Sequence, residues 1–369
     1  MSTTTFLLAK DPTVDHGGDI ALSRLVMELA RASRPVDAIC LSQRAHEPSP
    51  NRSVLRVPKP PVALPWLIFR SLRERKSVVH LRYDVSALRD AIDEREPELF
   101  VAEHNYMVEA FLGSRHRGRT PLALNTVNSE SIVWRSTRGL GGRIEAPRIV
   151  ADEVRTALAA RAVATYDRDE VDFYRGRGVN RAHWLDITLP PAQQAPVADS
   201  GSTLVFLGDR TWPPNQEAFE LLIGWWPEIA RGIPNASLLV VGKRADRWKP
   251  RPLPDGMTDI GFADDLDAVL NSCRALLAPV LTGGGVRVKL LEAASRGLPV
   301  VGTAAALGSH AELFGIGVND SREEFVAQCR RFLLDRSAAA AEGERLYRVN
   351  ADRWVQQVPH KRVAEWLAP

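Results

Sequence analysis

Short apolar runs alternate with longer segments of helical periodicity along most of the chain. The first run, residues 5–9, has the length and composition of a buried strand, and Gly17-Gly18 follows as a turn. Asp19 then stands where a helix cap is expected. The positions that follow place one apolar face on a helix, at Ala21, Leu22, Leu25, Val26 and Leu29. This segment predicts a βα unit.

The same alternation continues to about residue 188. Further apolar runs occupy residues 36–41, 99–102, 122–127 and 162–165, with charged helical segments between them. Such an order is typical of a mostly parallel sheet with helices on both sides. We therefore predict an N-terminal α/β domain over residues 1–188.

A second α/β pattern begins after a stretch rich in proline, glycine and serine. We interpret residues 189–202 as a linker, because they hold few large apolar side chains. Five short strands are then expected at 204–207, 238–241, 257–260, 275–280 and 299–301. Four of them lead into a glycine or the triple-glycine loop, and loops at the carboxyl ends of parallel strands are where open α/β sheets bind ligands. Residues 203–345 form the predicted second domain, and 346–369 a helical segment returning to the first.

Composition limits the classes of protein to which this chain can belong but does not identify a function. A chain of 369 residues exceeds what one core usually organises, which supports two domains. The net charge of +3 is too weak to argue for nucleic acid. Three widely separated cysteines (Cys40, Cys273 and Cys329) show neither a disulfide framework nor zinc spacing. We find no signal-peptide pattern and no apolar stretch of membrane-spanning length, so we expect a cytoplasmic protein.

Residues 283–299 carry the strongest chemical signal. Three glycines precede a helix with Arg287, Lys289 and, one to two turns along, Glu292. Glycine permits backbone conformations in which successive N–H groups converge on an anion at a helix N-terminus, where the dipole is positive. Arg287 and Lys289 add formal charge, and Glu292 can accept hydrogen bonds from sugar hydroxyls. The pattern predicts a diphosphate site suited to a nucleotide-sugar.

Several passages together resemble the GT-B glycosyltransferases, within them the family-4-like group, glycosyl transferases group 1. The passages are Gly17-Gly18, Phe206-Leu207-Gly208 through Trp212-Pro213-Pro214-Asn215, Val240-Val241-Gly242, Ile260-Gly261-Phe262 through Asp264-Asp265-Leu266, and Ala278-Pro279 through Gly297-Leu298-Pro299-Val300-Val301. The resemblance implies two Rossmann-like α/β domains facing across a cleft. It also implies transfer with retention of anomeric configuration and no metal. The nucleoside-diphosphate sugar is a co-substrate bound by the C-terminal domain, no further cofactor is implied, and the acceptor binds mainly to the first domain.

The resemblance also implies which residues bind the donor. Glycines near the strand ends let the backbone approach the diphosphate, Gly261 and Phe262 lie beside the nucleobase, and Glu292 holds the ribose. The implied donor-binding residues are Gly17, Gly18, Gly208, Asp209, Arg210, Trp212, Gly242, Lys243, Gly261, Phe262, Gly283, Gly284, Gly285, Val286, Arg287, Val288, Lys289 and Glu292.

Two positions depart from the family. Many relatives carry two glutamates with seven residues between them, and the first of the pair falls here on Gly284. Relatives with a Gly-x-Gly-x-Arg-x-Lys turn share this loss. The family's histidine before Asn128 is Val127, which can neither donate nor accept a hydrogen bond. His104 is a substitute candidate, so the implied catalytic residues are Arg287, Lys289, His104 and Asn128.

Other interpretations compete with some of these assignments. Asp265-Leu266-Asp267 resembles a metal-binding Asp-x-Asp, but carboxylates are also favoured at the start of a helix, which is the interpretation we adopt. A GT-B scaffold that binds nucleotide-sugars without transferring them is the alternative function, motivated by Val127 and Gly284. A nicotinamide-dependent oxidoreductase is disfavoured, because the first turn lacks the Gly-x-Gly-x-x-Gly spacing.

The acceptor is less determined than the donor. A natural product, another small molecule, or a cell-envelope glycan or lipid all stay open. Residues 62–70 are largely apolar and lead into Arg73, Arg75 and Lys76, a composition that suits contact with lipid head groups at the inner face of the membrane. We favour a packed helix with a solvated end for this segment, with weak peripheral membrane contact as the alternative.

Overall fold

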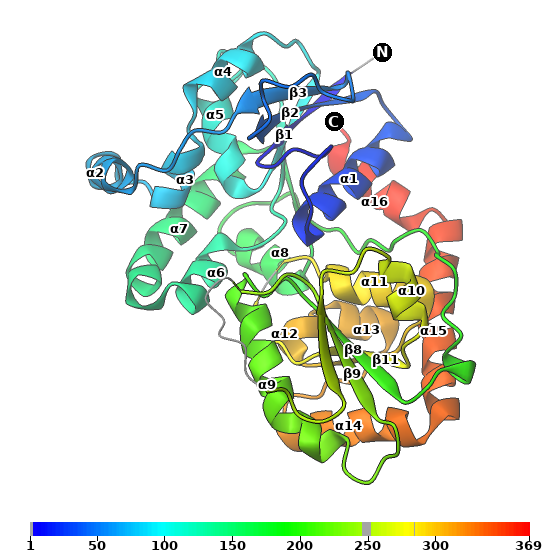
Figure 1. Ribbon diagram of the computed structural model, residues 1–369. Coiled ribbons are helices and arrows are strands. Elements are labelled where there is room, and N and C mark those ends of the chain that lie inside the picture. Colours follow the sequence, from blue (N-terminus) through cyan, green and yellow to red (C-terminus); the bar gives the residue numbers. More distant parts are fainter. Residues whose placement is uncertain (1–2, 246–251, 284) are drawn as a thin grey trace. The chain divides into compact units, whose positions relative to one another are not determined.

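The computed structural model describes residues 3–245, 252–283 and 285–369. The chain forms two compact units, which we describe separately (Figure 1). Of the described residues, the first unit comprises 3–186, 285–286 and 359–369, and the second comprises 187–245, 252–283 and 287–358. The C-terminal segment thus belongs with the first unit.

A seven-stranded parallel sheet organises the first unit, in the order β3-β2-β1-β4-β5-β6-β7. Its central strands are wholly buried, as expected for a parallel sheet that helices cover. Its elements are β1 (Thr4–Leu8), α1 (Gly18–Arg31), β2 (Val36–Ser42), β3 (Val54–Pro58), α2 (Leu64–Glu74), α3 (Val78–Tyr83), α4 (Ser86–Asp93), β4 (Leu99–Glu103), η1 (Asn105–Met107), α5 (Val108–Leu112), β5 (Leu122–Asn125), α6 (Glu130–Thr137), α7 (Gly139–Ala159), β6 (Ala162–Thr165), α8 (Arg168–Arg175) and β7 (Ala182–Trp184).

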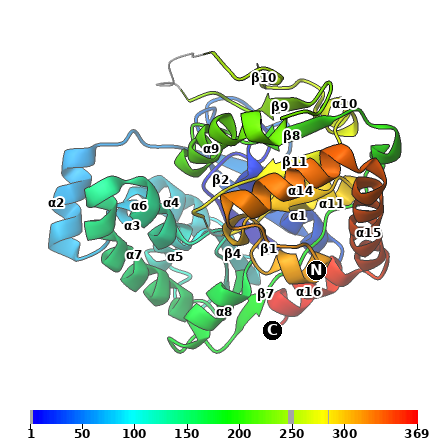
Figure 2. The same cartoon turned by 90° about the horizontal axis from the view of Figure 1, so that it is seen from below.

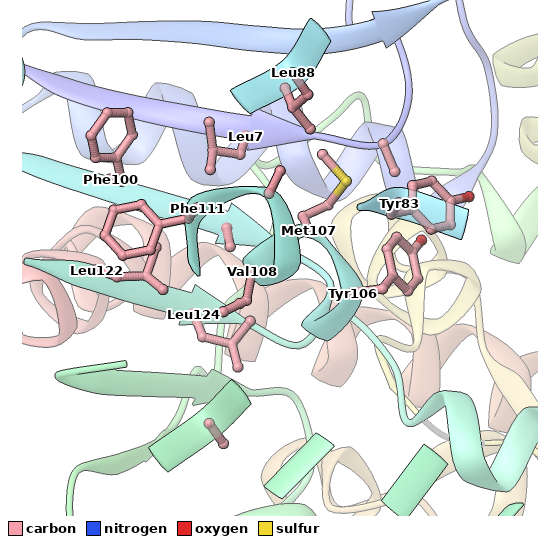
Figure 3. Packing of buried hydrophobic residues seen from close by; sticks show 14 of the residues in the cluster. Leu7, Tyr83, Leu88, Phe100, Tyr106, Met107, Val108, Phe111, Leu122 and Leu124 are labelled. Atoms are coloured by element: carbon pink, nitrogen blue, oxygen red, sulfur yellow. The ribbon is translucent and has the colours of Figure 1, made fainter. Parts of the chain in front are cut away.

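The core of the first unit lies where the sheet meets η1, α4 and α5 (Figure 3). Leu7, Phe100 and Leu124 from three strands pack with Met107 and Phe111, and all five are at least 97% buried. Burying a side chain of this size stabilises the fold by about 1.5–3 kcal/mol relative to exposure. This packing fixes the carboxyl ends of β1, β4 and β5, where the first unit's candidate site residues lie.

The second unit contains a five-stranded parallel sheet in the order β10-β9-β8-β11-β12. Figure 2 shows its helices from below. Its elements are η2 (Val197–Asp199), β8 (Thr203–Leu207), α9 (Pro213–Ile229), β9 (Ser237–Val241), β10 (Met257–Gly261), α10 (Leu266–Asn271), β11 (Ala275–Ala278), α11 (Val288–Arg296), β12 (Val300–Gly302), α12 (Ala304–Leu307), α13 (His310–Phe314), α14 (Arg322–Leu334) and α15 (Arg336–Val355). The last helix, α16 (Val358–Leu367), follows a left-handed residue at Gln357.

The predicted α/β class with two parallel sheets is confirmed, and each of the ten expected strands is present. The sequence analysis missed β3 and β7, which form the two edges of the first sheet. Both are short and only partly buried, so neither shows a continuous apolar run. In the described residues, no helix is long and apolar enough to cross a membrane.

The segment interpreted as a linker packs against the second unit. The backbone N–H groups of Ala192 and Ala195 donate to the carbonyl oxygens of Ser295 and Arg296, at 2.9 and 2.8 Å. Tyr347 on α15 donates to the Ala192 carbonyl. A chain held by these bonds has little freedom, so residues 189–202 are better described as part of the second unit's surface.

Candidate functional site

Three glycines follow adjacent strands of the second sheet. Gly208 follows β8, Gly242 follows β9 and Gly261 ends β10. Their backbones are joined in a row: Gly208 N–H donates to Val241 O at 2.8 Å, and Gly242 N–H donates to Gly261 O at 2.7 Å. A Cβ on Gly242 would lie 2.1 Å from the Gly208 carbonyl oxygen, and the φ of Gly242 is 128°, a value that only glycine adopts easily. Gly242 therefore allows the ends of β8 and β9 to approach closely.

Arg210 has a structural role in this rim. Its side chain is 1% exposed and forms two 2.8 Å bonds to the Asp259 carboxylate, with a third bond of 3.1 Å to the Gly242 carbonyl. Burial raises the pKa of Asp259, but the hydrogen bonds and charge of Arg210 outweigh it and leave that pKa below its usual value. The guanidinium of Arg210 thus holds the ends of β9 and β10 together, and its direct contact with the donor stays a prediction.

Lys289 is half-buried and is held by uncharged neighbours. It lies in the first turn of α11, where its ammonium donates to Asn215 Oδ1 at 2.6 Å and lies 5.1 Å from the centre of the Phe206 ring. Desolvation lowers the pKa of Lys289 from 10.5 to about 7. These partners are uncharged, so a bound anion would supply the missing counter-charge.

Asn215 orients this lysine. Its Nδ2 donates to the Asp209 carbonyl at 2.7 Å, which leaves Oδ1 facing Lys289. A Cβ on Gly208 would lie 2.9 Å from the Asn215 amide carbon. The glycine after β8, the asparagine in the first turn of α9 and the lysine in α11 thus form one packed group.

The remaining predicted donor residues line the more open part of the rim. Trp212 is half-buried, and its ring lies 3.5 Å from where a Cβ on Gly283 would stand. Asp209 and Lys243 are exposed, and Phe262 is 72% exposed. An aromatic ring left so open has surface available for stacking on a flat ligand such as a nucleobase.

The glycine-rich turn is described apart from Gly284, which lies outside the described residues. Gly285 has a left-handed φ of 79°, as the glycine pattern predicts. Gly285 and Val286 are grouped with the first unit, and the chain rejoins the second at Arg287. Arg287 is the N-cap residue of α11, and the helix itself begins at Val288.

Glu292 has an intramolecular partner. Its carboxylate pairs with Arg296 one turn along α11, and Arg296 also bonds Asp267 at the start of α10. A ribose hydroxyl at Glu292 would therefore share the carboxylate with Arg296. The expected role is compatible with this pairing, because a carboxylate accepts up to four hydrogen bonds.

The two implied catalytic residues of the first unit, His104 and Asn128, lie together. His104, directly after β4, places Nδ1 3.3 Å from the Asn128 Oδ1. Burial lowers the pKa of His104 to about 4, so the ring is neutral near pH 7. His104 stacks on Tyr106 at 4.9 Å, and its backbone has a left-handed φ of 71°. The neighbouring Val127 also has a positive φ, 60°, which is rare for a β-branched residue.

Gly17 and Gly18 lie near His104 at the same sheet edge. Gly17 caps α1 with a φ of 123°, and Gly18 begins the helix. A small pocket, just large enough for a water molecule, is lined by Lys10, Asp19, Ser23, Glu103 and His104, among others. Lys10 and Asp19 form a 2.6 Å ion pair there.

Sequence reasoning missed three polar residues that support these sites. Asp259 pairs with Arg210, Asn215 holds Lys289, and Glu103 accepts from Ser23 and Asn125 at 3.0 Å each. Burial raises the pKa of Glu103 to about 7. Asn215 ends one of the passages that resemble the family, so its role could have been predicted from that motif. Asp259 and Glu103 lie inside strands, and the sequence signal for them is a polar residue at a position expected to be buried.

The rejected metal motif is a helix cap. Asp265 Oδ1 accepts the Ala268 N–H at 2.8 Å at the start of α10, as the interpretation of this motif predicted. Across the part of the chain that is described, no group of three His, Cys, Asp or Glu side chains is placed to hold a metal ion.

Comparison with known proteins agrees with this geometry. Residues 201–335 match the family model described as glycosyl transferases group 1. No curated protein sequence is significantly similar to the chain. One similar structure is sucrose-phosphate synthase from Thermosynechococcus elongatus, with a TM-score of 0.75, 15% sequence identity and 98% of both chains covered. A second is WaaG, a glycosyltransferase involved in lipopolysaccharide biosynthesis, with a TM-score of 0.69, 15% identity, and 99% of this chain and 100% of WaaG covered. A third is HepE from Anabaena in complex with UDP and glucose, with a TM-score of 0.65, 13% identity and 98% of both chains covered.

These likenesses extend over nearly the whole chain, although identity is low. The structures establish the fold, and the family match covers most of the second unit, including the glycine-rich turn, Lys289 and Glu292. Together they indicate a glycosyltransferase: the chain has the GT-B fold, and its residues 201–335 match the glycosyl transferases group 1.

Proposed function

We propose that the protein transfers a sugar from a nucleoside-diphosphate sugar to an acceptor, with retention of anomeric configuration and without a metal ion. The observation that carries the proposal is Lys289, a desolvated cation held by neutral Asn215 and Phe206 in the first turn of a helix that follows a glycine-rich loop. A diphosphate supplies the anionic partner that this site lacks.

The proposed chemistry is electrostatic. Departure of the nucleoside diphosphate leaves negative charge on the β-phosphate and positive character on the sugar. Lys289, Arg287 and backbone N–H groups stabilise the leaving phosphate. Each well-placed donor of this kind contributes on the order of 3 kcal/mol, by analogy with oxyanion holes.

Metal independence follows from the same charges in this proposal. In metal-dependent transferases a divalent cation neutralises the diphosphate, whereas here Arg287 and Lys289 take that task. The leaving phosphate accepts the proton of the acceptor hydroxyl, so no protein side chain is required as the base. Retention accords with proton transfer and sugar transfer on one face of the ring.

We assign the acceptor to the first unit. His104 and Asn128 supply the hydrogen-bonding groups there in place of the family's histidine, which is Val127 in this chain. Neutral His104 donates from one ring nitrogen and accepts at the other, a combination that a hydroxyl can use. HepE was solved with UDP and glucose, which supports a UDP-sugar as the first donor to test.

A nucleotide-sugar-binding protein without transfer activity is the second candidate, because Val127 lacks the hydrogen-bonding groups of the family's histidine. The structure gives this candidate less support, since His104 and Asn128 bring such groups to the same sheet edge.

Incubation with UDP-, GDP- and TDP-sugars tests the proposal. We expect slow release of nucleoside diphosphate into water with one donor class, faster release once an acceptor is found, and no change on adding EDTA. NMR of the product should show the donor's anomeric configuration. Binding of a sugar nucleotide without any release of nucleoside diphosphate would favour the binding protein, and inverted product would contradict retention.

A further inference from the structure

Helix α2 (Leu64–Glu74) exposes an unusual amount of apolar surface. Leu64, Trp66, Phe69 and Leu72 are each between 53 and 61% exposed, and Ile68 is 47% exposed. Leu67 and Ser71 are the buried residues of the helix. Isolated exposed apolar residues need no explanation, but five on one short helix form a continuous patch that calls for a partner.

The five exposed side chains follow one another around α2 at spacings of three and four residues. Leu64, Ile68 and Leu72 are four residues apart and so project from the same side, while Leu67 and Ser71 project from the side that faces α3. Trp66 and Phe69 stack at 5.5 Å between ring centres, which joins them into one aromatic surface. Figures 1 and 2 both show α2 at the outer edge of the first unit.

Basic groups border this apolar face. Arg73 and Arg75 are exposed at the end of α2, whereas Lys76, which follows them, pairs with buried Glu109 at 2.8 Å. The acidic groups nearby are neutralised by partners of their own: Glu74 pairs with Arg70, and Asp84 pairs with Arg70 and Arg89. The patch therefore presents apolar side chains beside net positive charge.

Helices α6 and α7 of the same unit repeat this composition. Ile132, Leu140 and Ile144 are 45, 74 and 65% exposed, and exposed Arg135, Arg138 and Arg143 lie among them in the sequence. Arg148 of α7 donates to Ser71 of α2 at 3.5 Å, so the two elements are in contact. Glu145, the acidic residue within this part of α7, is turned inward and accepts the Val78 N–H.

We propose that α2, with the exposed residues of α6 and α7, is a docking surface for an anionic lipid membrane. Tryptophan, phenylalanine and leucine insert at the level of the head groups, while arginine attracts anionic lipids. A protein partner would be matched by shape, whereas a bilayer requires only this combination of apolar and basic groups on a projecting helix. The sequence analysis favoured a packed helix for residues 62–70, but most of the large apolar side chains of α2 are exposed.

The docking surface is connected to the rim that holds His104. Helix α3 packs against α2, and Tyr83 at its end stacks on Tyr106 with ring centres 4.0 Å apart. Tyr106 in turn stacks on His104. Membrane docking would thus place a buried aromatic stack between the bilayer surface and a candidate catalytic residue.

Co-sedimentation with vesicles tests the proposal on the full chain. We expect the protein to bind phosphatidylcholine–phosphatidylglycerol vesicles, and to bind pure phosphatidylcholine vesicles much more weakly. The triple variant Trp66→Ser, Phe69→Ser, Leu72→Ser should lose at least about tenfold in partition coefficient. Removing one charge by Arg73→Gln should cost about fivefold on the anionic vesicles alone.

A matched control comes from apolar residues of similar exposure elsewhere. Leu158, Leu334 and Val355 are 55, 66 and 78% exposed, so their triple serine variant removes a comparable apolar area and should bind vesicles like the parent. Equal loss in both triple variants, or no vesicle binding by the parent, would overturn the proposal. A parent dimer that the α2 triple converts to a monomer would also overturn it, by showing that a second copy covers the face. Because sugar-nucleotide binding is measured without vesicles, it separates this result from the proposed function.

Discussion

The two candidate sites of this protein are built in different ways. In the second unit the rim is made largely of backbone: Gly242 lets the ends of β8 and β9 approach closely, and Lys289 bonds Asn215, which packs on Gly208. In the first unit the rim is made of side chains on strained backbone, with His104 and Val127 both at positive φ. A diphosphate is the same group in every nucleoside-diphosphate sugar, so a site built of backbone suits it. Acceptors differ from one another, so a site built of replaceable side chains suits an acceptor.

The strongest test of the backbone rim is Gly242→Ala. Its Cβ would meet the Gly208 carbonyl oxygen at 2.1 Å in a left-handed conformation, so we expect a loss of about 3 kcal/mol in the free energy of unfolding. Gly261→Ala is the matched control, since its φ is also positive but nothing lies within 4 Å of the added Cβ. It should cost about 1 kcal/mol. Urea denaturation measures both, and equal losses would show that the close approach of the strands is unimportant.

Replacing Lys289 separates binding from folding. We expect Lys289→Met to weaken binding of the sugar nucleotide by about 10- to 100-fold, because a charge-assisted hydrogen bond is lost. The melting temperature should stay the same or rise, since a desolvated ammonium is removed. Lys361→Met, at an exposed position on α16, is the control and should change the affinity far less. A similar loss in both variants would indicate general charge attraction and no specific site.

The contrast between the units also explains what the sequence could predict. The glycine positions of the second unit could be predicted from sequence, because glycines directly after apolar runs mark strand ends with backbone geometry that few other residues permit. His104 and Asn128 are ordinary residues 24 positions apart in sequence, and their 3.3 Å contact depends on how β4 and β5 pair. The partner of Arg210 was equally hidden: the glycine beside this cation is visible in the sequence, but Asp259, which pairs with it, lies 49 residues away.

His104→Asn tests the side-chain rim. Asparagine tolerates the left-handed backbone, so the fold should persist, while transfer should slow by about tenfold because the ring's hydrogen bonds are lost. Affinity for the sugar nucleotide should change little, since the donor is assigned to the second unit. His46→Asn, at an exposed position, serves as the control for transfer rate. A large loss of donor affinity in His104→Asn would contradict this division of roles.

The pH dependence of donor binding gives a smaller but specific effect. Burial lowers the pKa of Lys289 in the free protein to about 7, and a bound anion favours the charged form. Binding therefore takes up a proton above that pH, and affinity should fall by up to about tenfold per pH unit as pH rises beyond 7. A sugar nucleotide is the proper probe, because its diphosphate has no ionisation in this range. The slope should vanish in Lys289→Met, and a slope that survives would point to another group.

A crystal structure with a nucleoside-diphosphate sugar tests the central claim most directly. The account predicts that the β-phosphate lies within hydrogen-bond distance of Lys289 Nζ, at the turn before α11, with the base beside Gly261 and Phe262. A diphosphate bound elsewhere on the chain, with Lys289 unchanged on Asn215, would contradict it.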